Sequence, residues 1–413
     1  MENMTVACVQ QRMAIMDTRE EFEAEASRFL YQARAKAAQL VIFPELTGLM
    51  LAPPLISGFK LGFIKRADQG NRPAAGLVRR RLGRVSGAAA GAIGGGFRGS
   101  LVRLLAKNND ALLNVYLDTF GRLAREYGTA ILGGSLYTVD AETEQVRNRA
   151  YLFDANGRVL GYQDKLNLGP DEKDLAAAGT ELSVLETPFG RFGLVIGRDA
   201  LYPELARVLA IQGADVLVGI AASPGTAQAG ISRSAMALRA EENQVFAVAS
   251  FLLGPNYAGQ DNREDYLGQS AILAPISLTD RGDGVLVQAG TNRTESLIAA
   301  ELDAEALYDL RETSRFRPRS QMNLGSHGMD LADFYREGQT IEQLVAQYVA
   351  ASEISEPESP IEAVQDLDVD EVDDVIEPVL QPEELDAETN LASVPDALSL
   401  TGYQDSHEET QAE

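Results

Sequence analysis

Three polar positions of the chain follow directly on predicted buried strands. Glu45 comes after the apolar run 39–43, and Lys165 comes after the returning strand of a predicted hairpin. The corner 197–199 comes after the apolar run 192–196. A carboxylate at the mouth of a buried strand is costly unless it is exposed, paired or at work in proton transfer. By residue type alone, however, Glu45 could be a solvated loop residue and Lys165 one of many surface lysines.

The stretch 189–221 indicates how the corner is held. Its apolar run is bounded by glycines, as in a buried strand. Pro203 suits the first turn of a helix, which we expect to stop near Gly213, and a second apolar strand follows at 216–221. Strand, corner, helix and strand form a βαβ unit, and such units place chemistry at the carboxyl end of the strand.

The other predicted elements alternate in the same way, which indicates an α/β fold. We expect strands at 4–10, 39–43, 129–137, 149–154, 158–162, 245–253, 271–273, 285–288 and 296–302. We expect helices at 18–36, 110–127 and 235–243, a helix running into an extended segment at 304–317, a loop at 222–230 and a mobile polar stretch at 260–266. Cys8 lies within the first strand, where an isolated cysteine behaves as a small apolar residue.

Several segments together resemble the nitrilase, or carbon–nitrogen hydrolase, superfamily. VIFPELTGL surrounds Glu45, TAILGGSLY begins at Thr129, and QDKLNL contains Lys165. The corner region matches the family's nucleophile segment at Gly193, Ile196, Asp199, Tyr202, Pro203 and Glu204. The resemblance covers about 4–54 and 109–325. It implies a four-layer α-β-β-α sandwich of the nitrilase type, and a homodimer or higher homo-oligomer to which 304–317 contributes.

The resemblance also implies roles for individual residues. Glu45 takes the position of the general base, and Lys165 takes that of the cation that stabilises the tetrahedral oxyanion. Glu172 matches a second glutamate near the site, with Asp171 as the competing candidate. The position that should be the nucleophilic cysteine is Gly197, and the aromatic position after it is Arg198.

Glycine offers no side-chain atom for covalent attack on a substrate, so we consider two hypotheses for the function. The first is a pseudoenzyme that binds a small polar carbonyl or carboxylate ligand, or a partner. The second is an active amide or nitrile hydrolase that uses water or an unorthodox nucleophile with Glu45 and Lys165. Arg198 adds a permanent cation beside the site, so the pocket is expected to favour anions.

Residues 55–107 form an insert that the family lacks. Eleven of them are Lys or Arg, only Asp68 is acidic, and 87–96 is nearly all Gly and Ala. The insert could be a disordered or loosely packed loop, a surface for anionic lipid in which Phe59, Phe63, Leu77 and Phe97 take part, or a dock for the acidic tail. Nothing in it resembles a specific nucleic-acid module.

The charge of the chain is concentrated at one end. The formal net charge of the 413 residues is −25, but residues 351–413 hold twenty acidic residues and no Lys or Arg, which leaves −5 for the rest. We therefore expect a nitrilase-like domain over 1–345 and a disordered acidic tail over 346–413. The tail could serve solubility alone or bind a partner.

Several classes of protein are excluded by composition. Cys8 is the only cysteine and the two histidines, His327 and His407, are far apart, so neither a disulfide nor a Cys/His zinc site is expected, and we expect no metal and no cofactor. The chain shows no signal pattern and no apolar run of roughly 18 residues. A cytoplasmic protein is the default, with a peripheral membrane association through the insert as the alternative.

Overall fold

The computed structural model describes residues 1–56, 96–107, 110–259 and 264–315, with short stretches between 317 and 346. The chain divides into two compact units, Met1–Asn323 and Leu324–Glu413, and the division comes before the boundary at 345 expected from the sequence. In the second unit, α9 spans His327–Glu337. The Gly/Ala-rich part of the insert, the acidic tail beyond 346 and the polar positions 260–263 lie outside the described residues.

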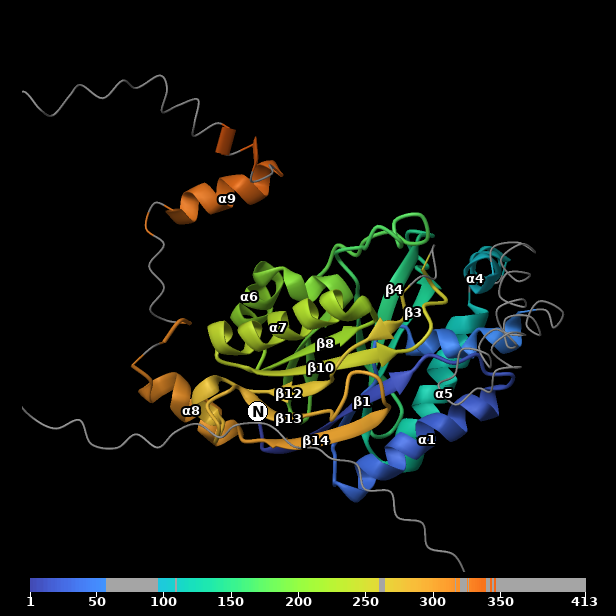
Figure 1. Cartoon of the computed structure of the whole chain (residues 1–413), viewed down its shortest axis with the longest axis horizontal. Coiled ribbons are helices and arrows are strands. Elements are labelled where there is room, and N and C mark those ends of the chain that lie inside the picture. Colours follow the sequence, from blue (N-terminus) through green and yellow to red (C-terminus); the bar gives the residue numbers. More distant parts are fainter. Residues whose placement is uncertain are drawn as a thin grey trace, which may run out of the picture. The chain divides into compact units, whose positions relative to one another are not determined.

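The first unit is built on a large sheet (Figure 1). Its main strand order is β5-β4-β3-β2-β1-β10-β8-β7-β6, with β12 beside β10, β13 beside β12 and β14 beside β1. The strands are β1 Met4–Arg12, β2 Leu40–Ile42, β3 Ala130–Val139, β4 Val146–Phe153, β5 Val159–Asp164, β6 Val184–Thr187, β7 Gly190–Ile196, β8 Val216–Ala221, β10 Phe246–Leu253, β12 Ala271–Leu273, β13 Val285–Gln288 and β14 Ser296–Leu302. A separate short sheet pairs β9 Ser223–Pro224 with β11 Tyr266–Leu267.

Alternation along the strands produces the layers. Val6 and Cys8 of β1 belong to an inner core with alternate residues of β7, β8 and β10, whereas Ala7 and Val9 belong to the core under the helices. Helices α1 Arg19–Ala35 and α5 Ala111–Tyr127 cover the half around β1 to β4. Helices α6 Pro203–Ile211 and α7 Gly225–Asn243 cover the half around β7, β8 and β10 (Figure 1). The result is the predicted α-β-β-α arrangement.

Local signals set the ends of these helices. Thr18 caps α1, since its hydroxyl oxygen accepts a hydrogen bond from the Glu21 N–H at 3.2 Å. Helix α5 ends at Gly128, whose φ of 63° is in the left-handed region that favours glycine. Helix α8, Ala304–Thr313, is capped by Asp303 and is the helix predicted at the start of 304–317.

Two expectations from the sequence were wrong. Residues 222–230 are not a loop, because they contain β9 and the first six residues of α7, of which Ala229 is buried. The insert is not loosely packed throughout, because its end forms α4, Gly96–Lys107, with Phe97, Leu101, Leu104 and Leu105 buried. Phe97 is therefore not available to a lipid surface; Phe59, Phe63 and Leu77 lie outside the described residues. Within the described part of the chain, no helix has the length and apolarity needed to cross a membrane.

Candidate functional site

The three positions singled out in the sequence lie around one cavity of about 140 Å³. Glu45 follows β2, Gly197 follows β7 and Ala222 follows β8, so the carboxyl ends of parallel strands meet there. Lys165 comes from the end of β5. The remaining lining residues are Leu46, Tyr137, Gly169, Pro170, Asp171, Glu172, Arg198, Ser223, Pro224, Gln228, Ser232, Asn256, Ala258, Gly259 and Tyr266.

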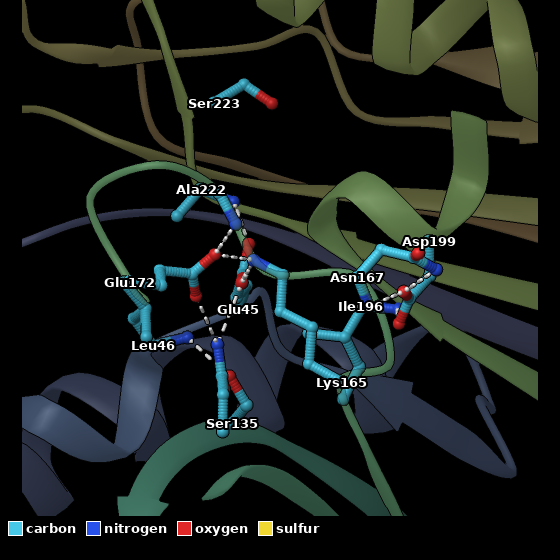
Figure 2. A network of polar contacts seen from close by, with 12 residues as sticks. Glu45, Leu46, Ser135, Lys165, Asn167, Glu172, Ile196, Asp199, Ala222 and Ser223 are labelled. Atoms are coloured by element: carbon cyan, nitrogen blue, oxygen red, sulfur yellow. Dashed lines mark hydrogen bonds and ion pairs between the residues drawn. The ribbon is translucent and has the colours of Figure 1, made fainter. Parts of the chain in front are cut away.

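Glu45 is held by three donors although its side chain is almost entirely buried. Its Oε1 accepts from Lys165 Nζ at 2.8 Å and from Asn148 Nδ2 at 3.0 Å, and its Oε2 accepts from the Ala222 N–H at 2.7 Å (Figure 2). The next residue, Leu46, has a φ of 63°, a strained value that the hydrogen bond from its N–H to Ser135 Oγ at 2.9 Å helps to hold. The strand end is thus shaped to present this carboxylate.

The burial of Glu45 has an electrostatic consequence. Loss of water raises the pKa of its carboxyl group, although Lys165 acts in the opposite direction. A carboxylate with a raised pKa beside a cavity is a suitable proton acceptor.

Lys165 and Glu172 complete the network. Lys165 Nζ donates to Glu172 Oε2 at 2.6 Å, and this oxygen also accepts from the Gly169 N–H at 2.8 Å. Burial acts against the ammonium, but the two carboxylates raise the pKa of Lys165 above its ordinary value. Burial likewise acts against the charge of Glu172, but Lys165 and the other donors lower the pKa of this carboxyl. Glu172, and not the exposed Asp171, makes these contacts.

Two further members of the network, Tyr137 and Asn148, were not predicted as site residues, although Tyr137 ends the segment TAILGGSLY. Tyr137 Oη donates to Glu172 Oε1 at 3.1 Å, and Asn148 Nδ2 donates to the same oxygen at 3.2 Å. Tyr137 and Asn148 face each other across β3 and β4, and the Lys165 N–H donates to the Asn148 carbonyl at 2.8 Å. The pairing of β3 with β4 therefore brings both residues to the site, and their contacts could be predicted only once the register of these two strands was known.

Gly197 lies at the centre of these groups. Its φ is 55°, and a β-carbon built on it would lie 2.8 Å from Glu45 Oε2 and 2.8 Å from Lys165 Nζ. Any side chain at this position would therefore touch both groups. Asp199 fixes the corner, because its carboxylate accepts from the N–H groups of Ile196, Leu166 and Asn167 at 3.3, 3.0 and 2.7 Å (Figure 2).

Cys8, Ser223 and Ser232 are the thiol and the cavity hydroxyl groups to compare with position 197. Cys8 is buried in β1, where its thiol donates to the Ala249 carbonyl at 3.4 Å, and burial raises the pKa of this thiol to about 12. Ser223 and Ser232 line the cavity, but their hydroxyl groups pair with each other at 3.2 Å. Figure 2 shows Ser223 apart from the Glu45 and Lys165 network. Among the described residues, no group of three or more His, Cys, Asp or Glu side chains is arranged to hold a metal ion.

Arg198 lines the same cavity but stands outside the network. Its side chain passes near Gly169, since a β-carbon at Gly169 would lie 3.6 Å from Arg198 Cδ. Its Nε is buried and has no hydrogen-bond partner. The sequence placed this cation beside the corner, and the structure brings it to the cavity wall.

The end of the insert reaches the rim of the cavity. Arg98 of α4 donates to the Ala258 carbonyl and pairs with Asp174 Oδ1 at 2.6 Å. Phe97 packs against Tyr257, with ring centroids 6.1 Å apart. Helix α4 thereby supports the 254–259 segment, which supplies cavity residues.

Comparison with known proteins identifies the family to which the chain belongs. The carbon–nitrogen hydrolase family model matches residues 5–312. A probable hydrolase of Bacillus subtilis, YhcX, is 30% identical over 204 residues, which are 49% of this chain and 39% of that protein. An omega-amidase of Saccharomyces cerevisiae is 26% identical over 200 residues, which are 46% of this chain and 64% of that protein. The chain thus spans less than two thirds of the first curated relatives that it matches.

A solved structure agrees with the fold. The crystal structure of Saccharomyces cerevisiae Nit3, a member of branch 10 of the nitrilase superfamily, superposes with a TM-score of 0.53 at 20% identity. The match covers 78% of this chain and 97% of that one. At this identity the likeness concerns the architecture of the first unit.

Proposed function

Because the chain belongs to the carbon–nitrogen hydrolase family, we propose that it binds a small polar carbonyl compound beside Gly197 without cleaving it. The cavity of about 140 Å³ is smaller than the roughly 300–1,000 Å³ of sites for drug-sized ligands, which favours a small molecule. Lys165 has three ammonium protons and uses two of them on Glu45 and Glu172. The third is available to a carbonyl oxygen.

The observation that carries the proposal is the absence of a side chain at Gly197. A β-carbon there would touch both Glu45 and Lys165, so this is the position from which a nucleophile would act with those two groups. Loss of a nucleophile in a hydrolase costs on the order of 10⁶ in turnover. Cys8 is buried elsewhere, and among the described residues neither Ser223 nor Ser232 forms a hydrogen bond with Glu45 or Lys165, so none of the three is placed to act with that pair.

A second candidate function is amide hydrolysis by water, favoured by the raised pKa of Glu45 beside the space at Gly197. In this reaction Glu45 takes a proton from water while the hydroxide oxygen bonds to the amide carbon. Lys165 stabilises the resulting oxyanion. The carbon–nitrogen bond then breaks, and the proton on Glu45 passes to the departing nitrogen, so amide and water give a carboxylic acid and ammonia. The omega-amidase relatives support the same chemistry class.

One experiment separates the two candidates. A panel of small amides is incubated with the wild-type protein, with Gly197→Cys and with Gly230→Cys, and ammonia release and acyl adducts are measured. Gly230 is an exposed position of α7 with open space around it, so its cysteine is a matched control for adding a thiol. We expect turnover or a covalent adduct only in Gly197→Cys, and binding without turnover in the wild type.

The opposite result has a defined meaning. Turnover by the wild-type protein that is lost in Glu45→Gln would contradict the binding proposal and establish the second candidate. Absence of binding of every amide by calorimetry would contradict both.

A further inference from the structure

Two short segments that supply cavity residues differ in how they are held. The turn that carries Glu172 is fixed to the site, because its carboxylate accepts from Lys165 Nζ at 2.6 Å. In the segment 254–259, the Gly259 N–H donates to Asn256 Oδ1 at 2.7 Å. This bond shapes the segment without fixing it to the turn of Glu172.

Arg98 of α4 joins the two segments. One of its terminal nitrogens donates to the Ala258 carbonyl, and the other pairs at 2.6 Å with Asp174 Oδ1, two residues after Glu172. The Arg98 side chain is 13% exposed and that of Asp174 is 56% exposed, so the guanidinium lies beneath the surface. Arginine suits this place because its planar fork donates to two acceptors at once.

The helix that carries Arg98 is anchored independently of these two contacts. Its apolar face is buried in the same core as Tyr257 and Tyr266, through Phe97, Leu101, Leu104 and Leu105. Since the burial of apolar surface holds the helix, the loss of the Arg98 contacts leaves α4 in place. The guanidinium therefore acts as a bridge between two walls of the cavity.

We propose that Arg98 sets the upper size of the molecule that can enter the cavity, because it holds 254–259 against the turn of Glu172. The inference goes beyond the proposed function, since the size limit applies whether the molecule is bound or cleaved. Asp174 is largely exposed, so salt weakens its pairing with Arg98. Entry of larger molecules should therefore depend on the salt concentration.

A thiol placed in the cavity reports entry without any need for a ligand. Ser223 lines the cavity and is buried, and Ser223→Cys introduces a side chain of similar shape. The native Cys8 is fully buried in β1. The full chain is alkylated with iodoacetamide or N-benzyl iodoacetamide, which share a reactive group and differ in size, and mass spectrometry gives the rates. Each rate is divided by that of Gly230→Cys, an exposed position.

The substitutions are made in the Ser223→Cys protein. Arg98→Ala should raise the rate with the N-benzyl reagent roughly tenfold, as for the loss of one charged hydrogen bond, while the rate with iodoacetamide stays within about twofold. Asp174→Asn keeps Arg98 but removes the ion pair, so it should give part of this increase. Val102→Ala changes an exposed residue of the same helix and should alter neither rate.

Salt separates the bridge from a general loosening of the fold. Raising the sodium chloride concentration from about 0.05 to about 0.5 M should accelerate the N-benzyl reaction when Arg98 is present and leave Arg98→Ala unchanged. Equal rates of this reaction with and without Arg98, including no reaction in either protein, would overturn the proposal. An equal gain with both reagents would overturn it as well, because the size limit would then be absent. Both outcomes leave the proposed function in place, since no ligand takes part.

Discussion

Gly197 faces Lys165 so closely that a β-carbon added to the glycine would lie 2.8 Å from the lysine Nζ. The same β-carbon would lie 2.8 Å from Glu45 Oε2. The lysine and the glutamate are 2.8 Å apart, and this short bond passes beside the space that a side chain would occupy. Glycine at this position is therefore compatible with a closed network, and a larger residue has to displace the ends of two flexible side chains.

The first prediction concerns Gly197→Ala. The left-handed φ of 55° costs a residue with a β-carbon about 1–3 kcal/mol, and the added methyl group also pushes Lys165 from Glu45. We expect the free energy of unfolding, measured by urea denaturation, to fall by at least that amount. Gly230→Ala is the control, since its helical position has no neighbour within 4 Å and should gain about 0.5–1 kcal/mol. Equal effects of the two substitutions would contradict the crowding at 197.

The second prediction concerns the only thiol. Because Cys8 is buried and its pKa is raised to about 12, we expect no reaction of the native protein with a disulfide reagent at pH 8 and one thiol per chain after unfolding in urea. The folded state holds this proton more tightly than the unfolded chain. Above about pH 8.5 the thiol ionises in the unfolded chain but not in the folded protein, which favours unfolding. The free energy of unfolding should therefore be unaffected by Cys8 below about pH 8.5 and should fall as the pH rises toward 12. Rapid labelling of the native protein would show that Cys8 is accessible after all.

The sequence could predict those site residues that lie in a short recognisable segment, but not those brought to the site by the pairing of distant strands. Glu45, Lys165 and Gly197 each lie in a short segment with its own pattern, and the structure brings all three to one cavity. Asn148 lies in no such segment, and Tyr137 ends the segment TAILGGSLY, which did not indicate a role for its side chain. Their contacts with Glu172 arise from the pairing of β3 with β4, and no local pattern fixes that register.

The two errors in the fold also have physical causes. Helix α4 follows a basic Gly/Ala-rich run, and that composition concealed the apolar face of Phe97, Leu101, Leu104 and Leu105. The first half of α7 is rich in small and polar residues, of which Ala229 and Ser232 are buried, and its second half packs Met236 and Ala240 into the core. In both cases tertiary packing outweighed a weak local preference.

The third prediction concerns Asp199, which joins the corner to the segment after Lys165. In Asp199→Ala the N–H groups of Leu166 and Asn167 lose their acceptor, which should cost about 2 kcal/mol or more of unfolding free energy. Because Leu166 adjoins Lys165, we also expect weaker binding of the small amides, measured by calorimetry. Asp303→Ala removes a helix cap on α8 and should cost about 1 kcal/mol without changing binding. If both variants bind like the wild type, Asp199 does not position the site.

The fourth prediction concerns the support that the insert gives to the cavity rim. Arg98→Ala removes the contacts of α4 with the Ala258 carbonyl and with Asp174, so amide hydrogen exchange in 254–259 should become faster. Val102→Ala is the control on the same helix, since Val102 is an exposed residue of α4. Mass spectrometry of peptides covering 254–259 measures the effect. Unchanged exchange in Arg98→Ala would show that the rim holds its conformation without the insert.

The fifth prediction concerns Lys165→Met, which leaves the buried Glu45 and the half-buried Glu172 without their cation. At neutral pH this should cost about 3–5 kcal/mol of unfolding free energy. In the wild type, Lys165 lowers the pKa of Glu172, so this part of the stability is present above the unfolded value near 4.3 and is lost as the pH falls through the folded value. In the variant, burial raises both carboxyl pKa values, and protonation relieves the repulsion. The difference in unfolding free energy between the wild type and the variant should therefore become smaller as the pH is lowered. The double variant Lys165→Met with Glu172→Gln should recover part of the lost stability at pH 7. A gap that is constant from pH 7 to pH 4.5 in urea denaturation would show that these charges do not govern the stability of the network.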